Sequence, residues 1–252
     1  MSQTTVPIPL KHQPTDFLQI LASQGLTFAE YLQYQGEPGV LYELYRGRLI
    51  EMPTATFLHA EICGFIVYKL QQYFASANIN LVVRTGIGVR TDVDVSRIPD
   101  VTVCSQSLWE QLLLRTGAGV LDTQANELPQ LVIEVVSDDA RRDYIIKRAE
   151  YAMIRIPEYV ILDPHKDRVW LLTNPESEDV YDRLEFKRGQ EFRSVQFPDL
   201  VLSVDEILSP PVVENLIKQE KQDFLWQLDR ERQRAERLAA KLREMNIDPD
   251  SV

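Results

Sequence analysis

The stretch Leu131–Ser137 constrains the fold of this chain more than any other part of the sequence. It reads Leu-Val-Ile-Glu-Val-Val-Ser, an apolar run with a single carboxylate, Glu134, in its middle. Valine and isoleucine favour a short buried β-strand. An ionised glutamate inside such a strand is costly unless a metal ion or a cation lies beside it. The sequence therefore predicts that Glu134 has a charged partner and a function.

Two other stretches supply candidate partners for Glu134. Ile98–Val103 is a second apolar stretch that carries Asp100 near its start, and residues 139–155 form a predicted helix that carries Lys147. This order of strand, strand and helix predicts a mixed β-sheet with helices on its faces, which is an α/β fold. Each partner also has a simpler interpretation, because aspartate after proline is common in turns and most helix lysines are solvated.

The combination of these residues indicates a metal site. Two carboxylates that enter one pocket from neighbouring strands provide the oxygen ligands that Mg²⁺ or Mn²⁺ prefers, and the backbone carbonyl of Val135 is a candidate third ligand. We expect the carboxylates of Asp100 and Glu134 to lie within about 6 Å of each other. A lysine such as Lys147 can orient or deprotonate water and neutralise charge on a phosphate.

The composition limits the function and the cellular location. The formal net charge of −11 is unlike that of a protein that coats DNA non-specifically, but a nuclease can be acidic when a divalent metal neutralises its site. No apolar run is long enough to cross a bilayer, so no membrane partner is expected. Cys63 and Cys104 lie far apart, with no metal-ligand spacing and no disulfide framework, which favours a cytoplasmic location.

The pattern of the remaining chain predicts one large domain over residues 16–210, preceded by a disordered lead-in over residues 1–15. The local predictions within this domain are a helix over Asp16–Leu21, a β-hairpin over Leu41–Met52, a helix over His59–Phe74, a strand over Leu81–Val89 and an irregular excursion over Ser105–Gln130. The excursion is long enough to have a function of its own.

The C-terminal region over residues 211–252 has a different character. After Pro210-Pro211, the stretch 213–245 contains no glycine or proline, and seven of the nine residues at its two heptad core positions are apolar. This pattern predicts a long helix that pairs with a second copy as a coiled coil, and hence a homodimer. The alternative is a single amphipathic helix that packs on its own domain.

Several short motifs occur in an order that resembles a known family. They are Tyr42-Glu43-Leu44, Gly47-Arg48-Leu49, His59, Pro99-Asp100-Val101, Glu134-Val135-Val136-Ser137, Lys147-x-x-x-Tyr151 and Pro157–Pro164. Over about residues 25–210 the chain thereby resembles the Uma-type restriction endonucleases, long catalogued as a domain of unknown function, and more widely the PD-(D/E)XK nuclease superfamily. The resemblance implies a restriction-endonuclease-like fold and Mg²⁺-dependent hydrolysis of phosphodiester bonds in DNA.

The resemblance also implies roles for individual residues. Asp100 and Glu134 would be catalytic residues that hold the metal ion together with the carbonyl of Val135. The superfamily places its catalytic lysine at the position that Val136 occupies here. An apolar side chain cannot serve there, so the resemblance implies that this role has moved to Lys147 on the following helix.

Three further residues are accessory candidates, each with a second interpretation. Glu43 can reach the metal ion or be paired within its hairpin, His59 can contact the substrate or simply begin its helix, and Tyr151 can assist catalysis or belong to the core. Two other functions also stay open. The fold can serve as a binding protein that cuts nothing, or it can hydrolyse a small phosphate ester in a narrow closed pocket.

Overall fold

The computed structural model describes residues 25–137, 140–176, 180–245 and residue 248. The predicted lead-in over residues 1–15 and the predicted helix over Asp16–Leu21 lie outside these ranges. The chain forms two compact units, one that ends at Ser209 and one that begins at Pro210.

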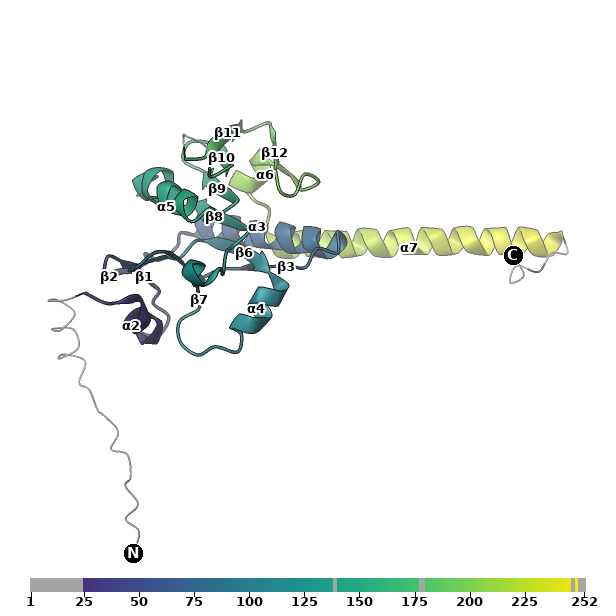
Figure 1. Cartoon of the computed structure of the whole chain (residues 1–252). Coiled ribbons are helices and arrows are strands. Elements are labelled where there is room, and N and C mark those ends of the chain that lie inside the picture. Colours follow the sequence, from purple (N-terminus) through teal and green to yellow (C-terminus); the bar gives the residue numbers. More distant parts are fainter. Residues whose placement is uncertain (1–24, 138–139, 177–179, 246–247, 249–252) are drawn as a thin grey trace, which may run out of the picture. The chain divides into compact units, whose positions relative to one another are not determined.

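A mixed six-stranded sheet lies at the centre of the first unit (Figure 1). In spatial order its strands are β11 (Asp182–Lys187), β10 (Arg168–Thr173), β9 (Glu158–Asp163), β8 (Leu131–Val135), β6 (Val101–Ser105) and β3 (Leu81–Arg84). Within this sheet the β8–β9 pair is parallel and the other pairs are antiparallel. The α/β fold with a mixed sheet is therefore confirmed, and the buried strands around Glu134 and after Asp100 are both present.

The crossover between the parallel strands β8 and β9 is helical, because parallel neighbours cannot be joined by a tight turn. It contains the π-helical segment η2 (Arg142–Lys147) and the α-helix α5 (Arg148–Met153). The predicted helix over residues 139–155 is thus present in its described part, but its first turns are wider than those of an α-helix. Such π-helical turns are rare and occur frequently at functional sites.

Alternation along β8 divides its side chains between the two faces of the sheet. On one face, Val132 belongs to a buried cluster that includes Tyr151 of α5. On the other face, Ile133 lines a small apolar cavity, and helix α3 (Phe57–Ser76) packs against the strand. Glu134 is two residues from Val132, so its side chain points toward α5.

A second sheet contains five short strands. Their spatial order is β2 (Arg48–Glu51), β1 (Tyr42–Tyr45), β5 (Val95–Arg97), β4 (Gly88–Asp92) and β7 (Val120–Leu121). The predicted hairpin is confirmed, since β1 and β2 pair in antiparallel fashion around Arg46 and Gly47. Both turn residues have positive φ, as a two-residue hairpin turn of this kind requires.

The predicted strand over residues 81–89 is wrong as a single element. β3 ends at Arg84 and β4 begins at Gly88, and the two strands belong to different sheets. Between them the chain turns at Gly86, whose φ of +67° is easily adopted only by glycine. This glycine was the signal that the apolar run is interrupted.

The predicted irregular excursion over residues 105–130 is also wrong in part. It contains helix α4 (Gln106–Leu112), strand β7 and the 3₁₀ turn η1 (Thr123–Ala125). Ser105 caps α4, because its hydroxyl accepts the backbone N–H of Leu108 at 3.2 Å.

The remaining elements of the first unit are short. They are helix α2 (Phe28–Gln33), strands β12 (Glu191–Arg193) and β13 (Val201–Ser203), which pair with each other, and helix α6 (Val204–Leu208). The helix predicted over His59–Phe74 is confirmed as α3, slightly longer at both ends. Within the described ranges, no helix combines the length and the apolar character that crossing a membrane requires.

The second unit is dominated by one long helix, α7 (Val213–Glu244), which spans 32 residues. None of its residues is buried, and several large apolar side chains are exposed along it, among them Ile217, Phe224 and Leu228. The predicted long helix is therefore confirmed, whereas its pairing with a second copy stays a prediction.

Candidate active site

Asp100 immediately precedes β6, and Glu134 lies on the neighbouring strand β8. β6 and β8 are antiparallel, and their pairing aligns Val101 with Ile133. One residue further along, Asp100 lies opposite Glu134, and residues that are directly opposite each other share a face. The two predicted metal-binding carboxylates therefore project from adjacent strands toward one region, and their expected separation of about 6 Å stays a prediction.

Asp100 is held by one backbone group and one histidine. Its Oδ2 accepts a hydrogen bond from the N–H of Val135 at 2.7 Å, and its Oδ1 lies 3.0 Å from Nε2 of His59. His59 also belongs to the first turn of α3, where its backbone N–H donates to the capping hydroxyl of Thr56. His59 thus begins its helix and faces Asp100 at the same time, so both interpretations of this residue are compatible with the geometry.

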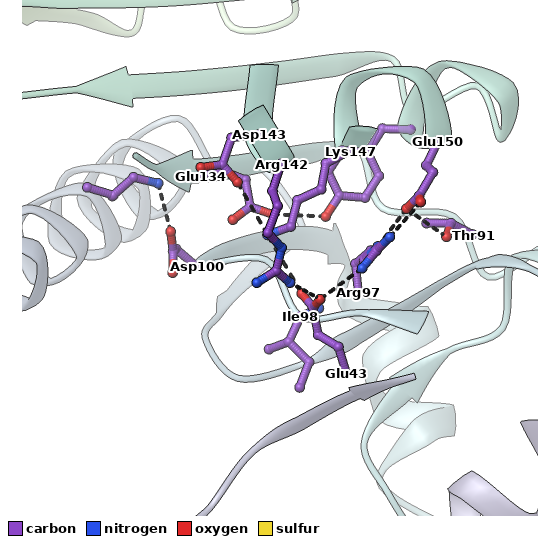
Figure 2. A network of polar contacts seen from close by, with 12 residues as sticks. Glu43, Thr91, Arg97, Ile98, Asp100, Glu134, Arg142, Asp143, Lys147 and Glu150 are labelled. Atoms are coloured by element: carbon purple, nitrogen blue, oxygen red, sulfur yellow. Dashed lines mark hydrogen bonds and ion pairs between the residues drawn. The ribbon is translucent and has the colours of Figure 1, made fainter. Parts of the chain in front are cut away.

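Glu134 is buried, with Lys147 directed toward it (Figure 2) and Tyr151 in hydrogen-bond contact. Nζ of Lys147 lies 2.7 Å from its Oε1, and the hydroxyl of Tyr151 donates to the same oxygen at 2.9 Å. The ring of Tyr151 is fully buried and packs edge-on against Tyr159. Lys147 therefore points toward Glu134, as the sequence predicted, and Tyr151 is both a core residue and a neighbour of the site.

The helical crossover places its polar side chains at intervals of four residues. Asp143, Lys147 and Tyr151 are all buried on this segment, and Oδ1 of Asp143 lies 3.6 Å from Nζ of Lys147. Asp143 was missed by the sequence analysis, although its spacing from Lys147 is that of an i,i+4 ion pair. The site consequently contains one more carboxylate than the motifs indicated.

Glu43 enters the same cluster from β1 and is paired with cations. Its carboxylate contacts the guanidinium groups of Arg97, at 3.0 Å, and Arg142, accepts the N–H of Ile98 at 3.2 Å and lies 3.7 Å from Nζ of Lys147. These contacts support the interpretation of Glu43 as a paired residue over that of a metal ligand.

Arg97 extends this network toward the helical crossover and was also missed by the sequence analysis. Its Nε and Nη2 donate to the two carboxylate oxygens of Glu150 at 2.7 and 2.6 Å, and Thr91 donates to Glu150 at 3.2 Å (Figure 2). A two-pronged arginine–carboxylate contact of this kind is geometrically specific. Arg97 therefore links Glu43 on the second sheet to the helix that carries Lys147.

Burial makes the carboxyl groups of Glu134, Asp100 and Asp143 poor acids. It raises the pKa of Glu134 well above its usual range, against the opposing charge of Lys147, and the charges of Asp100 and Asp143 add to this effect. Burial also raises the pKa of Asp100, and it raises that of Asp143 to about 6. Together these carboxyl groups form a concentration of negative charge that a cation would stabilise.

Lys147 and Glu43 respond in the opposite way, because each is surrounded by opposite charges. Burial by itself lowers the pKa of Lys147, but Glu134, Glu43 and Asp143 outweigh burial and raise it overall. Burial by itself raises the pKa of Glu43, but three neighbouring cations lower it overall. Lys147 is therefore protonated at neutral pH, when it donates hydrogen bonds and accepts no proton.

A second group of potential metal ligands adjoins the site. His59, Cys63 and Asp100 each present one ligand atom, and these three atoms lie within 4.8 Å of one another. The distance between the two cysteines in the sequence gives no sign of this group. The informative pair is His59 and Cys63, which are four residues apart on α3. Burial raises the pKa of the Cys63 thiol, and the carboxylates of Asp100 and Glu134 raise it further.

Each predicted site residue contacts at least one other predicted site residue. Asp100, Glu134 and Lys147 lie at the centre, Val135 binds Asp100 through its N–H, and the accessory candidates Glu43, His59 and Tyr151 contact the central residues. Val136, at the position of the superfamily lysine, is buried in the apolar cluster. Its burial agrees with the interpretation that any lysine function here must come from another element.

The fold is similar to that of a solved structure. A crystal structure from Anabaena variabilis, described as "a putative nuclease belonging to DUF820", superposes with a TM-score of 0.56 at 19% sequence identity, over 73% of this chain and 98% of that chain. No curated protein matches the sequence. The sequence model of the Uma2 family, described as "Putative restriction endonuclease", matches residues 28–205. Since this range is more than half of its length, the chain belongs to the Uma2 family of nuclease-like proteins.

Proposed function

We propose that this protein is an endonuclease that uses Mg²⁺, or Mn²⁺ in its place, to hydrolyse phosphodiester bonds in DNA. The observation that carries the proposal is the buried pair of Lys147 and Glu134, 2.7 Å apart, next to Val135, whose N–H binds Asp100. A buried ion pair is seldom more stable than well-packed apolar side chains. Its presence, together with raised carboxyl pKa values, supports a catalytic rather than a structural purpose.

The donor set fits a hard divalent cation. Asp100 and Glu134 offer carboxylate oxygens and Val135 offers a backbone carbonyl, which are the ligands that Mg²⁺ takes in proteins. The raised pKa values of Asp100 and Glu134 fit as well, because both carboxylates are costly to ionise until a cation approaches. When bound, the metal ion would stabilise negative charge on the phosphate and lower the pKa of a water molecule.

Lys147 would orient the attacking water or a phosphate oxygen through its ammonium group. Its raised pKa argues against a role as the proton acceptor. Glu43 lies 3.7 Å from Nζ and is itself anchored by Arg97 and Arg142, so it would keep the lysine in place. Tyr151 donates to Oε1 of Glu134, which would fix the direction of that carboxylate.

A binding protein that keeps this fold but cuts nothing is the second candidate. The observation that favours it is the net charge of −11, because binding to DNA is driven mainly by neutralisation of phosphates. Such a protein would not require the metal ion. Metal binding at Asp100 and Glu134 therefore separates the two functions before any cleavage is measured.

We further propose that residues 16–210 form the nuclease domain and that residues 211–252 form a coiled-coil extension that makes the protein a homodimer. Exposed apolar side chains along α7 support this assignment. A dimer would present two active sites to a duplex, which suits cleavage of both strands. Both cysteines are free thiols, which is compatible with the expected cytoplasmic location.

The decisive experiment is a nicking assay on supercoiled plasmid with Mg²⁺ or with a chelator. The proposal requires conversion to the nicked or linear form only when the metal is present. Glu134→Gln keeps the shape of the side chain and removes its charge, so it should abolish cleavage. Glu158→Gln is the matched control, because Glu158 is a buried glutamate of β9 that lies on the opposite face of the same sheet.

The outcome is clear in either direction. Cleavage by the wild type and by Glu158→Gln, with none by Glu134→Gln, supports the nuclease. Equal cleavage by Glu134→Gln and the wild type would exclude this site as its source. Metal binding without cleavage of plasmid, single-stranded DNA or RNA would favour a different phosphate ester as the substrate.

A further inference from the structure

Three side chains beside the proposed Mg²⁺ site have a different chemistry from the carboxylates. His59 and Cys63 lie one turn apart on α3, so both face in the same direction. Asp100 approaches them from the start of β6, and its Oδ1 lies 3.0 Å from Nε2 of His59. The potential ligand atoms of all three residues lie within 4.8 Å of one another.

This spacing is close to that of a tetrahedral metal site. Ligand atoms at about 2.0–2.3 Å from a tetrahedral ion lie about 3.3–3.8 Å from one another. All three residues are partly exposed, so their side chains are not locked by complete burial and can adjust toward a bound ion. Asp100 is already oriented, since the N–H of Val135 holds its other carboxylate oxygen at 2.7 Å.

The donor atoms select a class of metal. Imidazole nitrogen and thiolate sulfur are ligands of Zn²⁺ and of similar transition metals, whereas Mg²⁺ takes oxygen ligands almost exclusively. Three protein ligands with one open position are also the usual arrangement of an accessible zinc site. The negative charge of Asp100 and the neighbouring Glu134 would further attract a divalent ion to this position.

We propose that His59, Cys63 and Asp100 bind a transition-metal ion of the Zn²⁺ class at a site that is separate from the Mg²⁺ site but shares Asp100 with it. On binding, the Cys63 thiol releases its proton to solvent and its sulfur bonds to the metal. The proton on Nε2 of His59, which faces Asp100 in the metal-free site, is also released to solvent while the other ring nitrogen keeps or takes up a proton, and the Nε2 lone pair then bonds to the metal. Zn²⁺ bound to Asp100 would compete with Mg²⁺ and so inhibit cleavage, and this consequence rests on the proposed function. The binding itself does not depend on nuclease activity.

The test uses Co²⁺ as a spectroscopic probe for Zn²⁺ on the full-length protein, with a reductant that contains no thiol. A bond between Co²⁺ and a thiolate gives a charge-transfer absorption in the near ultraviolet that oxygen and nitrogen ligands alone do not give. We expect this band to saturate at one ion per chain and to disappear when Zn²⁺ is added. Cys63→Ser should abolish the band, and His59→Ala should weaken Co²⁺ binding at least tenfold.

Cys104→Ala is the matched control, because Cys104 is the other cysteine and is buried in the apolar cluster of β6. This variant should retain the full band. A band that persists in Cys63→Ser, or a wild type without any band at saturating Co²⁺, would overturn the inference. A wild type that shows the band but cuts no nucleic acid would leave this inference standing while the proposed nuclease function fails.

Discussion

Asp143 provides a quantitative test of the idea that the carboxylates around Lys147 serve a cation and not the stability of the fold. Its carboxyl group is buried, and burial raises its pKa from 3.8 to about 6 against the opposing charge of Lys147. Replacing Asp143 by asparagine keeps the shape of the protonated side chain and removes the titration. We therefore expect Asp143→Asn to stabilise the metal-free protein at neutral pH.

The size of the effect follows from linkage between protonation and folding. A raised pKa means that the folded state binds the proton more tightly than the unfolded state, so stability falls as the pH rises from 3.8 through about 6. At about 1.4 kcal/mol for each pKa unit, the difference between the two pKa values of Asp143 corresponds to about 3 kcal/mol of stability. The folded protein has this stability at low pH and loses all of it above pH 6. For a domain of this size the change corresponds to an increase in melting temperature of roughly 6–12 °C in the variant.

The measurement is thermal unfolding of the wild type and of Asp143→Asn in a chelator, at pH 4.0 and at pH 7.0. Both values avoid the isoelectric point, which is about 4.8. The variant should be more stable at pH 7.0, with much of the difference in stability gone at pH 4.0. A variant that is less stable at pH 7.0, or a difference that does not change with pH, would refute this reasoning.

The remaining predictions concern the neighbours of the carboxylates and the C-terminal helix. Lys147→Met should abolish plasmid cleavage. It should also lower the free energy of unfolding by about 3–5 kcal/mol, because it leaves buried carboxylates without their cation. Lys147→Arg should not restore full cleavage, since a guanidinium differs in shape from an ammonium group. Tyr151→Phe removes a hydrogen bond to the ionised form of Glu134, so the acidic limb of the pH–rate profile should move to higher pH, and an unchanged profile would argue against this contact. Deleting residues 211–252 should leave a folded chain that sediments as a monomer, and a full-length protein that is itself monomeric at micromolar concentration would contradict the coiled-coil prediction.

Local sequence patterns were sufficient for the elements that carry the site. The apolar run around Glu134 favoured a buried strand, and the alternation of side chains then placed Glu134 on the opposite face from Ile133. The absence of glycine and proline in the stretch 213–245 likewise indicated one continuous helix. Where a local signal was overlooked, as at Gly86, one predicted strand proved to be two strands in different sheets.

The sequence by itself indicated that a carboxylate lies in a buried strand, that a second carboxylate opens another apolar strand, and that position 136 carries an apolar valine. These are local facts, because the period of a strand and the chemistry of a side chain need no distant contact. Only the tertiary structure decided the partners. Glu43 of β1 reaches Lys147 of the helical crossover, and Cys63 of α3 comes close to Asp100 at the start of β6. Such contacts depend on how elements far apart in the chain pack together, and residue spacing along the sequence carries no measure of that distance.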